Sequence, residues 1–513
     1  MKRRKFLHIG AAGAAGAALS SAFLASCDSM LEPEVHSQLA PSNLTDAGGI
    51  RAALAATYAE AQWGGTKARI NNMSEWMTDV QWQTGGGENR VASVIIQFNW
   101  GTDLPPFNFT WNKAYRAVRD ANIIIENVGA ADISEEQKAL YQAEARFVRG
   151  MAYWDLYRWY GPVPLRTSPS TNEQPAELAR ASEEEMRTFL ETEFTEIIPA
   201  LPPTVDARPD YEYGRATAGA ARGWLMRFLL NTKQWQKAAD TAQDIIDMNA
   251  YSLFDEESDP GTPAYLDMFR IENERNSEYI WADYTNVEGP GTNILNGTFP
   301  PGFQRNERTG LTWQGSWANW ASQYRILDDF YNSFDPADDR RAPIIAEYVN
   351  FAGDKVDLLA DFDDNTRAFK PWPDPGGQGN FHGNDQPRIR YSAVLLARAE
   401  ALNELRGPNQ ESIDLVNQVR ARASLDEISV SDFSSTQELR EYIVIKERGW
   451  EFYREGLRRD DLRRIDKFIE IAEERAIYDG GPIDPTRSLF PIPQSAIDAN
   501  PALEQNPGYG ANA

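Results

Sequence analysis

Cys27 is the only cysteine among the 513 residues of this chain, which limits how the fold can be stabilised. It follows small residues, an apolar Ala/Gly-rich run and the basic start Lys2-Arg3-Arg4-Lys5, a pattern typical of a lipoprotein signal peptide. We therefore expect residues 1–26 to be a signal peptide and Cys27 to be acylated. Each buried methylene of an acyl chain contributes about 0.8 kcal/mol to membrane attachment. No thiol then remains for disulfides, zinc or catalysis, so packing must hold the fold.

Two alternatives stay open at this N-terminus. Cys27 could be a buried free thiol behind an ordinary export signal. Arg3-Arg4 before Phe6-Leu7 fits the twin-arginine export route, but ordinary secretory signals also begin with basic residues. Beyond Leu24 the sequence has no uncharged apolar run of about 18 residues, so we expect no membrane-spanning helix.

The chain is strongly acidic, with 76 Asp and Glu against 51 Lys and Arg and a formal net charge of −25. Such a surface repels nucleic-acid phosphates and anionic lipid, so neither is an expected partner. Aromatic residues are also frequent, with 15 Trp, 20 Tyr and 23 Phe. Most of them are expected in helical cores, but indoles in loops also bind sugars, because a pyranose can stack its apolar face on an aromatic ring.

Helical periodicity dominates much of the chain. A long pattern from Ser134 to about Tyr160 predicts a helix with Ser134 as its N-cap and Gly161-Pro162 as its end. Further helices are predicted over 47–62, from Trp111 onward and over 436–453. These segments indicate a mainly α protein.

Two segments predict helix hairpins of about 34 residues, the length of a tetratricopeptide repeat. The first begins at Thr217 and breaks at Asn231-Thr232-Lys233. The second pairs Tyr391 to Leu405 with Glu411 to Ala423. Small alanines on facing helices allow the close approach that such pairs need.

Two long regions lack this periodicity, residues 63–106 and about 255–387, and both are rich in Gly, Asn and aromatic residues. Residues 27–41 are polar and indicate a lipidated tether. We expect a single mainly α domain over 42–513, with the two regions as irregular insertions that carry a few short strands. Long loops on a rigid scaffold usually carry binding sites, so function is expected there.

Five blocks of sequence, in order and with matching spacing, resemble those of the SusD/RagB family of outer-membrane nutrient-uptake lipoproteins. The blocks are Ala143 to Gly150 with Tyr160 to Pro164, Gly214 to Thr217, Arg390 to Ala401 with Val416 to Ala423, Glu447 to Leu462, and Phe490 to Pro493 with Asn500 to Tyr509. The similarity runs from Cys27 to the C-terminus. Arg459 departs from the pattern, because the family usually has an aromatic residue there.

The resemblance implies a SusD-like helical fold with tetratricopeptide-like pairs. It also implies a lipid-anchored position at the cell surface, on the outer membrane, and a partner, a TonB-dependent outer-membrane barrel of the SusC type. The chain would capture a nutrient, commonly a glycan, and deliver it to that transporter. No cofactor is expected.

The candidate ligand-binding residues come from the two insertions, because the family places its site there although no motif transfers by position. They are Trp76, Asp79, Trp82, Trp100, Trp313, Trp317, Trp320, Tyr324 and Arg325. Trp313, Trp317, Trp320 and Tyr324 have helical spacing and predict a helix stripe, for which a core face is the alternative. The loop tryptophans divide between core and ligand platform.

Glu447, Glu451 and Glu455 recur every four residues and predict a shared helix face. Because arginines alternate with them, we expect an ion-pair network rather than a catalytic site. The same interpretation is made for Glu400 with Arg398.

Asp361, Asp363 and Asn365 have the opening spacing of a calcium loop, but Thr366 and Trp372 stand where such a loop has Gly and Glu. An acidic, solvated turn is therefore expected. His36 and His382, the histidines outside the signal peptide, are isolated, so no metal site is predicted.

Three functions from different classes follow. The favoured one is a non-catalytic surface receptor for an oligosaccharide or similar nutrient. A helical-repeat scaffold for protein partners would instead bury the loop tryptophans. An anchored glycoside hydrolase would need two carboxylates flanking a cleft, and no motif points to such a pair.

Overall fold

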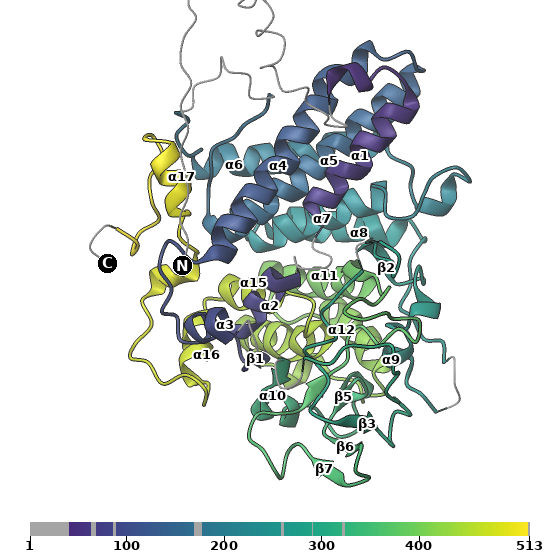
Figure 1. The fold of residues 1–513 in the computed structure, drawn as a ribbon, viewed down its shortest axis with the longest axis vertical. Coiled ribbons are helices and arrows are strands. Elements are labelled where there is room, and N and C mark those ends of the chain that lie inside the picture. The colour runs from purple at the N-terminus through teal and green to yellow at the C-terminus, as the bar shows by residue number, and fades with distance from the viewer. Residues whose placement is uncertain are drawn as a thin grey trace, which may run out of the picture.

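The computed structural model describes residues 40–62, 68–85, 89–168, 177–257, 261–289, 291–320 and 324–510. The predicted signal peptide and Cys27 lie outside these residues. Helices stack in the upper part of the molecule in Figure 1, and most of the short strands gather below them. None of the helices described is both long and apolar enough to cross a bilayer. The fold is mainly α with short strands, as the sequence predicts.

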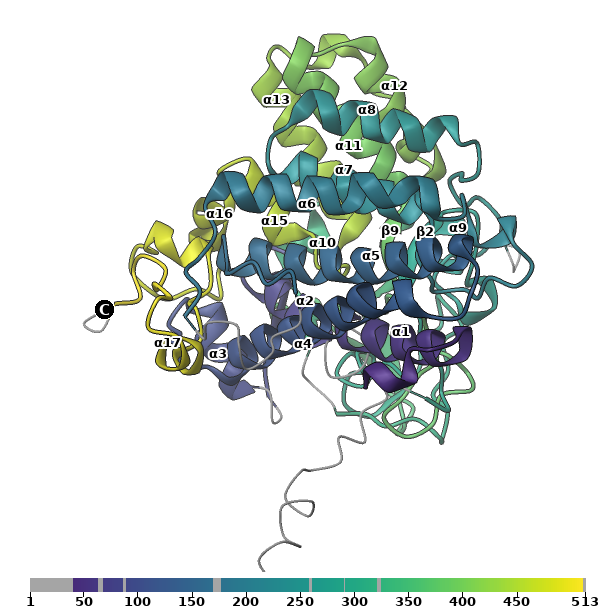
Figure 2. The ribbon, with the colours of Figure 1, turned by 90° about the horizontal axis from the view of Figure 1, so that it is seen from above.

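The scaffold is a row of helices that follow one another in space. It consists of α1 (Ala47–Ala61), α4 (Pro105–Asn127), α5 (Glu135–Tyr160), α6 (Glu183–Ile197), α7 (Ala218–Asn231), α8 (Trp235–Asp247), α11 (Tyr391–Arg406) and α12 (Gln410–Arg422). From above, the row runs from α1 and α4 through α5, α6 and α7 to α8, α11 and α12 (Figure 2). Each helix therefore buries its apolar face against its neighbours in one continuous stack.

The long helix α5 has the ends that the sequence predicts. The Ser134 hydroxyl accepts a hydrogen bond from the Gln137 backbone N–H, and the Gln137 side chain accepts one from the Ser134 N–H, which completes a capping box. Gly161 ends the helix with φ = +74°, a conformation that side chains with a Cβ rarely adopt. Within α5, Gly150 allows the Phe194 ring of α6 to approach closely.

Both predicted hairpins are confirmed as the pairs α7–α8 and α11–α12. The Thr217 side chain caps α7 by accepting from the Ala220 N–H, and Gly407 ends α11 with φ = +75°. Helix α8 packs against α11, so the two hairpins join although insertion 255–387 separates them in sequence.

The predicted helix over 436–453 is interrupted. Helix α13 (Thr436–Glu441) continues through a π-helical stretch (Tyr442–Glu447) into α14 (Arg448–Phe452). The chain then forms α15 (Arg458–Arg464), α16 (Phe468–Glu474) and α17 (Gln494–Ala499). Arg459, at the position where the family usually has an aromatic residue, is buried with its guanidinium over the rings of Trp159 and Phe490, 4.7 and 5.2 Å from their centroids.

The prediction of irregular structure over 63–106 is wrong for two short helices, α2 (Ala68–Trp76) and α3 (Asn89–Ile96), whereas β1 (Gln81–Gln83) is one of the few short strands predicted. Each of these helices spans fewer than three turns, which is too short to establish a period in the sequence. Helix α3 buries Ala92, Ile95 and Ile96, so packing rather than local periodicity fixes it.

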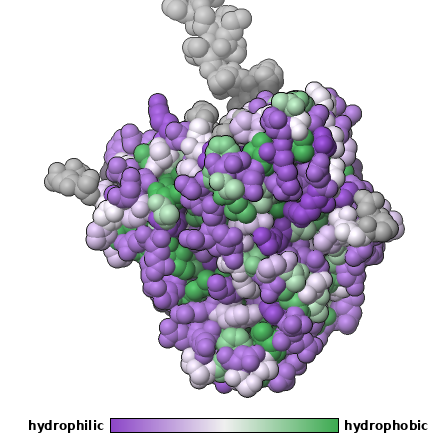
Figure 3. All heavy atoms as spheres, turned by 90° about the horizontal axis from the view of Figure 1, so that it is seen from below, coloured by the Kyte–Doolittle hydropathy of each residue, from purple (hydrophilic) through white to green (hydrophobic). Residues whose placement is uncertain are grey.

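The second insertion is built from short strands around its own apolar cluster. Its elements are α9 (Ala264–Asp267), β2 (Tyr279–Asp283), β3 (Phe303–Arg305), β4 (Tyr324–Ile326), α10 (Asp328–Asn332), β5 (Ile344–Ile345), β6 (Glu347–Asn350), β7 (Lys355–Asp357), β8 (Arg367–Ala368) and β9 (Gln386–Arg390). Strand β2 pairs with β9, β5 with β8, and β3, β6 and β7 form one sheet. Seen from below, the side on which most of the strands lie in Figure 1, the surface is mostly hydrophilic with small apolar patches (Figure 3).

The helix predicted from Trp313 to Tyr324 is wrong, because the backbone of the residues described there pairs with distant segments. Trp317 forms a bridge with Gly379, and the Trp320 N–H donates to the Asn296 carbonyl at 2.8 Å. Tyr324 begins β4 instead. The helical spacing of these aromatics therefore arises without a helix.

A buried ion-pair network around Arg390 confirms the structural interpretation of the glutamates. Arg390 lies 2.7 Å from carboxylate oxygens of both Glu451 and Glu455. Arg422 contacts Glu451 at 2.6 Å, and Lys370 contacts Glu455 at 2.6 Å. All these side chains are almost fully buried, so the network ties the strand end, α12 and α14 together.

The arginines near these glutamates in the sequence, and the pair Glu400 and Arg398, have other ion-pair partners than those predicted. Helix α14 ends at Phe452, so Glu455 does not share its face, and the neighbouring arginines turn elsewhere. Arg448 pairs with Asp461 and Arg458 with Asp79. Glu400 pairs with Arg464 at 2.6 Å, while Arg398 pairs with Glu411.

We expect Glu451→Gln to lower the free energy of unfolding by about 3–5 kcal/mol, because it leaves Arg390 and Arg422 undercompensated in the interior. Burial alone would raise the pKa of Glu451, but Arg422 and Arg390 outweigh it and hold that pKa below its ordinary value. Its stabilisation is therefore present at neutral pH and is lost as pH falls through the depressed folded-state pKa. Urea unfolding at pH 7 measures the loss.

The matched control is Glu347→Gln, which breaks an exposed pair with Lys355. Exposed pairs contribute about 0–1 kcal/mol, so this variant should unfold close to wild type. Equal losses in the two variants would contradict a special role for the buried network.

Candidate functional site

The two insertions meet at a two-stranded ribbon. Strand β1 of the first pairs antiparallel with β4 of the second, which sets Trp82 opposite Arg325. The half-buried Trp82 donates its indole N–H to the Asp364 carbonyl at 2.7 Å, and the Arg325 guanidinium lies 5.2 Å from the indole centroid. This cation–π contact fixes a partly exposed indole between the two regions in which the sequence predicts a site.

Two further candidate tryptophans are half-buried in the second insertion. The Trp320 indole N–H donates to the Asn380 side-chain oxygen at 3.0 Å. Trp313 meets Phe299 and Trp317 edge to face, with centroids 5.2 and 5.8 Å apart. Both indoles are held by neighbours while part of each ring reaches the surface, so each can offer a face to a flat ligand.

Four candidates lie in the core. Trp76 stacks on Tyr324, and the Trp100 indole N–H donates to the Tyr509 hydroxyl at 2.8 Å. Trp317 donates to the Asp374 carbonyl at 3.1 Å. None of the four is more than 6% exposed, so they support the site by packing.

Asp79 is anchored rather than free. Its two carboxylate oxygens accept from Arg458, with the Nε–Oδ1 distance at 2.8 Å. Beside it, Glu75 accepts from the Gly456 N–H at 2.9 Å and is buried. Burial raises the pKa of Glu75 to about 7, because the Gly456 hydrogen bond and the Arg458 charge offset the lost hydration only in part.

This raised pKa gives a pH-dependent prediction. The folded state favours the protonated, uncharged form of Glu75, and the stability that this form contributes is fully present below the ordinary carboxyl pKa. That stability is lost as pH rises through about 7. Glu75→Gln keeps an acceptor for Gly456 and should gain roughly 1–3 kcal/mol of unfolding free energy relative to wild type between pH 5 and pH 8. Thermal melts at both pH values test this. The exposed Glu427→Gln is the control and should melt close to wild type. A stability difference for Glu75→Gln that is the same at both pH values would contradict the prediction.

Two carboxyls, the half-buried Glu274 and the buried Asp385, are held by backbone amides. Glu274 accepts from the Asp385 N–H at 2.6 Å, and Asp385 accepts from the Thr285 N–H at 2.8 Å. Burial raises the pKa of both groups, and the Asp385 charge adds to the rise for Glu274. Their hydrogen bonds join segments of the insertion.

The residues that suggested a metal site have structural roles. The Asn365 side chain accepts from Arg367 at 2.7 Å, and the Asp361 carboxylate accepts from the Asp357 N–H at 3.2 Å. His382 is buried 5.5 Å from the Trp317 ring, and burial lowers its pKa to about 4. Within the described ranges, no group of three or more His, Cys, Asp or Glu is placed to hold a metal ion.

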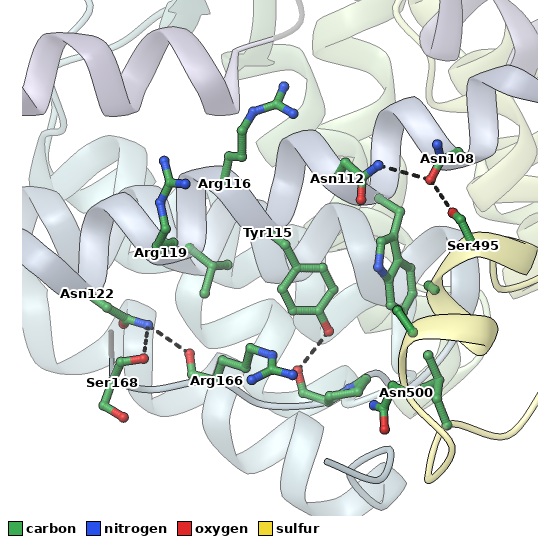
Figure 4. A pocket seen from close by; sticks show the side chains of 16 residues that line it. Asn108, Asn112, Tyr115, Arg116, Arg119, Asn122, Arg166, Ser168, Ser495 and Asn500 are labelled. Carbon is green, nitrogen blue, oxygen red and sulfur yellow. Dashed lines mark hydrogen bonds between the residues drawn. The ribbon is translucent and has the colours of Figure 1, made fainter. Parts of the chain in front are cut away.

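A cavity of about 760 Å³ lies apart from the β1–β4 ribbon, along the outer face of α4. Helix α4, segment 164–168 and α17 enclose this α4 groove, and Tyr115 donates to the Pro164 carbonyl at 2.8 Å on its floor (Figure 4). Its labelled polar residues are Asn108, Asn112, Arg116, Arg119, Asn122, Arg166, Ser168, Ser495 and Asn500. No sequence prediction included this groove. The spacing of Arg116 and Arg119 on the Trp111 helix was a local signal, but α17 arrives from the distant C-terminus.

Comparisons with known proteins agree with this fold. Residues 43–230 match a family model described as starch-binding and associating with the outer membrane. Residues 372–509 match the model of the SusD family. The chain belongs to the SusD/RagB family of outer-membrane-associated proteins.

Several relatives extend over most of the chain. A SusD-like protein of Formosa agariphila is 28% identical over 458 residues, which cover 82% of each chain. The starch-binding protein SusD of Bacteroides thetaiotaomicron is 22% identical and covers 85% of each. The structure of surface glycan-binding protein A from Bacteroides thetaiotaomicron in complex with laminarihexaose has a TM-score of 0.73 at 20% identity, covering 90% of this chain and all of that chain, which shows a shared fold.

Proposed function

We propose that this protein is a non-catalytic glycan receptor that delivers its ligand to a SusC-like TonB-dependent outer-membrane transporter. Its relatives include a starch-binding protein, and a protein of the same fold was solved with laminarihexaose. These names support a glycan as the ligand class. The transporter partner follows from the family resemblance alone.

The observation that carries the proposed binding site is the β1–β4 ribbon. It joins both insertions and holds the Trp82 indole against Arg325 with part of the ring exposed. An indole face gives a pyranose an apolar stacking surface, while the guanidinium can donate hydrogen bonds to its hydroxyls. Trp313 and Trp320 supply two further partly exposed indoles in the same insertion as Arg325.

Trp82→Ala should weaken binding of the recognised oligosaccharide at least tenfold, because stacking on the ribbon is lost. A glycan array identifies the ligand, and isothermal titration calorimetry measures its affinity. The same titration with Trp320→Ala tests the second indole.

Trp235→Ala is the matched control, because it removes another half-buried indole that belongs to α8 and not to the two insertions. It should leave the affinity unchanged. Unaltered binding by both Trp82→Ala and Trp320→Ala would overturn the proposed site, and the absence of binding to any glycan would favour a protein-interaction scaffold. Polysaccharide turnover by the purified protein would favour an anchored hydrolase.

The proposed attachment depends on Cys27, outside the described residues. Cys27→Ser should move the protein from the membrane fraction to the soluble fraction, because serine has no thiol that can be acylated. Fractionation with immunoblotting measures the shift, and surface labelling of wild type tests exposure. Undiminished membrane attachment of the variant would contradict the lipid anchor.

A further inference from the structure

The α4 groove differs in charge from the rest of this acidic protein. Among the residues that the structure describes, its lining includes Arg116, Arg119 and Arg166 but no carboxylate. Three other cavities in the described part of the chain each include at least two carboxylates among their lining residues. In a chain with a formal net charge of −25, a cavity of this composition is a local cationic site.

The three guanidinium groups are not equally compensated. Arg116 lies 3.2 Å from Glu60, and Arg119 lies 2.6 Å from Asp120. Arg166 has no ion pair with any residue that the structure describes, and its half-buried side chain extends along the groove below Tyr115 in Figure 4. Arg166 is therefore the cation most available to an incoming anion.

The guanidinium groups lie on both sides of the groove. Arg116 and Arg119 project from the α4 side, whereas Arg166 lies on segment 164–168 (Figure 4). A ligand that engages both sides needs more than one anionic group along its length. Guanidinium groups match carboxylate and sulfate oxygens with paired hydrogen bonds, which favours these anions.

Between the cations, the lining is neutral and polar over an aromatic floor. Asn112 is exposed and donates to Asn108, which also accepts from the Ser495 hydroxyl. The half-buried Tyr115 ring and Trp111 lie beneath. Amides that bind hydroxyls, rings that pack against C–H groups and a volume of about 760 Å³ suit a short saccharide.

We propose that the α4 groove is a second binding site, separate from the β1–β4 ribbon, for an acidic oligosaccharide that carries carboxylate or sulfate groups along its chain. Arg166 binds one anionic group, and Arg116 and Arg119 bind others. The acidic surface beyond the groove repels long polyanions, so only the segment within the groove is held.

The test titrates purified protein with oligogalacturonate and with a heparin-derived hexasaccharide at low ionic strength. At least one should bind, with an affinity that falls as salt increases. Arg166→Gln should weaken that binding at least tenfold, and Asn112→Asp, which places a negative charge in the groove, at least fivefold. Arg406→Gln, a matched loss of an exposed arginine on α11, should have no effect. Thermal melts confirm that each variant is folded.

Three further probes separate the sources of binding. Inorganic sulfate and polyglutamate should bind more weakly than the acidic saccharides, and equal binding by either would overturn the assignment to a saccharide. Failure of both acidic saccharides to bind, or equal loss with Arg406→Gln, would overturn the groove as the site. Binding of the glycan that Trp82→Ala weakens should be unaffected by Arg166→Gln, so failure of the groove proposal is distinguishable from failure of the ribbon site.

Discussion

The structure depends on the buried charge of Arg390. This residue ends β9 and immediately precedes α11, so it stands where the second insertion returns to the helical scaffold. Its guanidinium contacts Glu278 beside β2, Glu451 on α14 and Glu455 beyond α14. A charge in the interior is tolerated only when its partners are in place, so these segments are constrained to one relative arrangement. The insertion is thereby held in a fixed position on the stack of helices.

The scaffold could be predicted from the sequence because its signals are local. Ser134 with Gln137 defines the start of α5, and Gly161 its end, within a few residues of the helix. The hairpins were found for the same reason, since Gly407 and the Thr217 cap mark their ends. The error at 313–324 has the opposite cause. The aromatic residues there have a helical period, but the backbone of the described residues bonds to Asn296 and Gly379, and this long-range pairing overrides the local period.

The candidate site was predictable only in part. The choice of Trp82 and Arg325 drew on composition and on the two regions in which the family places its site, and the structure places them opposite each other across a strand pair. Burial could not be predicted for Trp76 or Trp100, because the packing partners of both lie far away in the sequence, Tyr324 and Tyr509. Ion-pair partners were equally hidden, since Glu400 meets Arg464 rather than its near neighbour Arg398.

The β1–β4 ribbon has a consequence for assembly of the molecule. Its two strands come from segments far apart in the chain, so closing the long intervening loop must precede their pairing. Long-range pairing of this kind slows folding. A glycan bound across both strands would stabilise the paired arrangement of β1 and β4 through mass action. Under the proposed function, ligand binding and completion of folding are then linked: a copy in which β1 and β4 have not paired lacks the binding surface, and a copy with ligand bound opens less often.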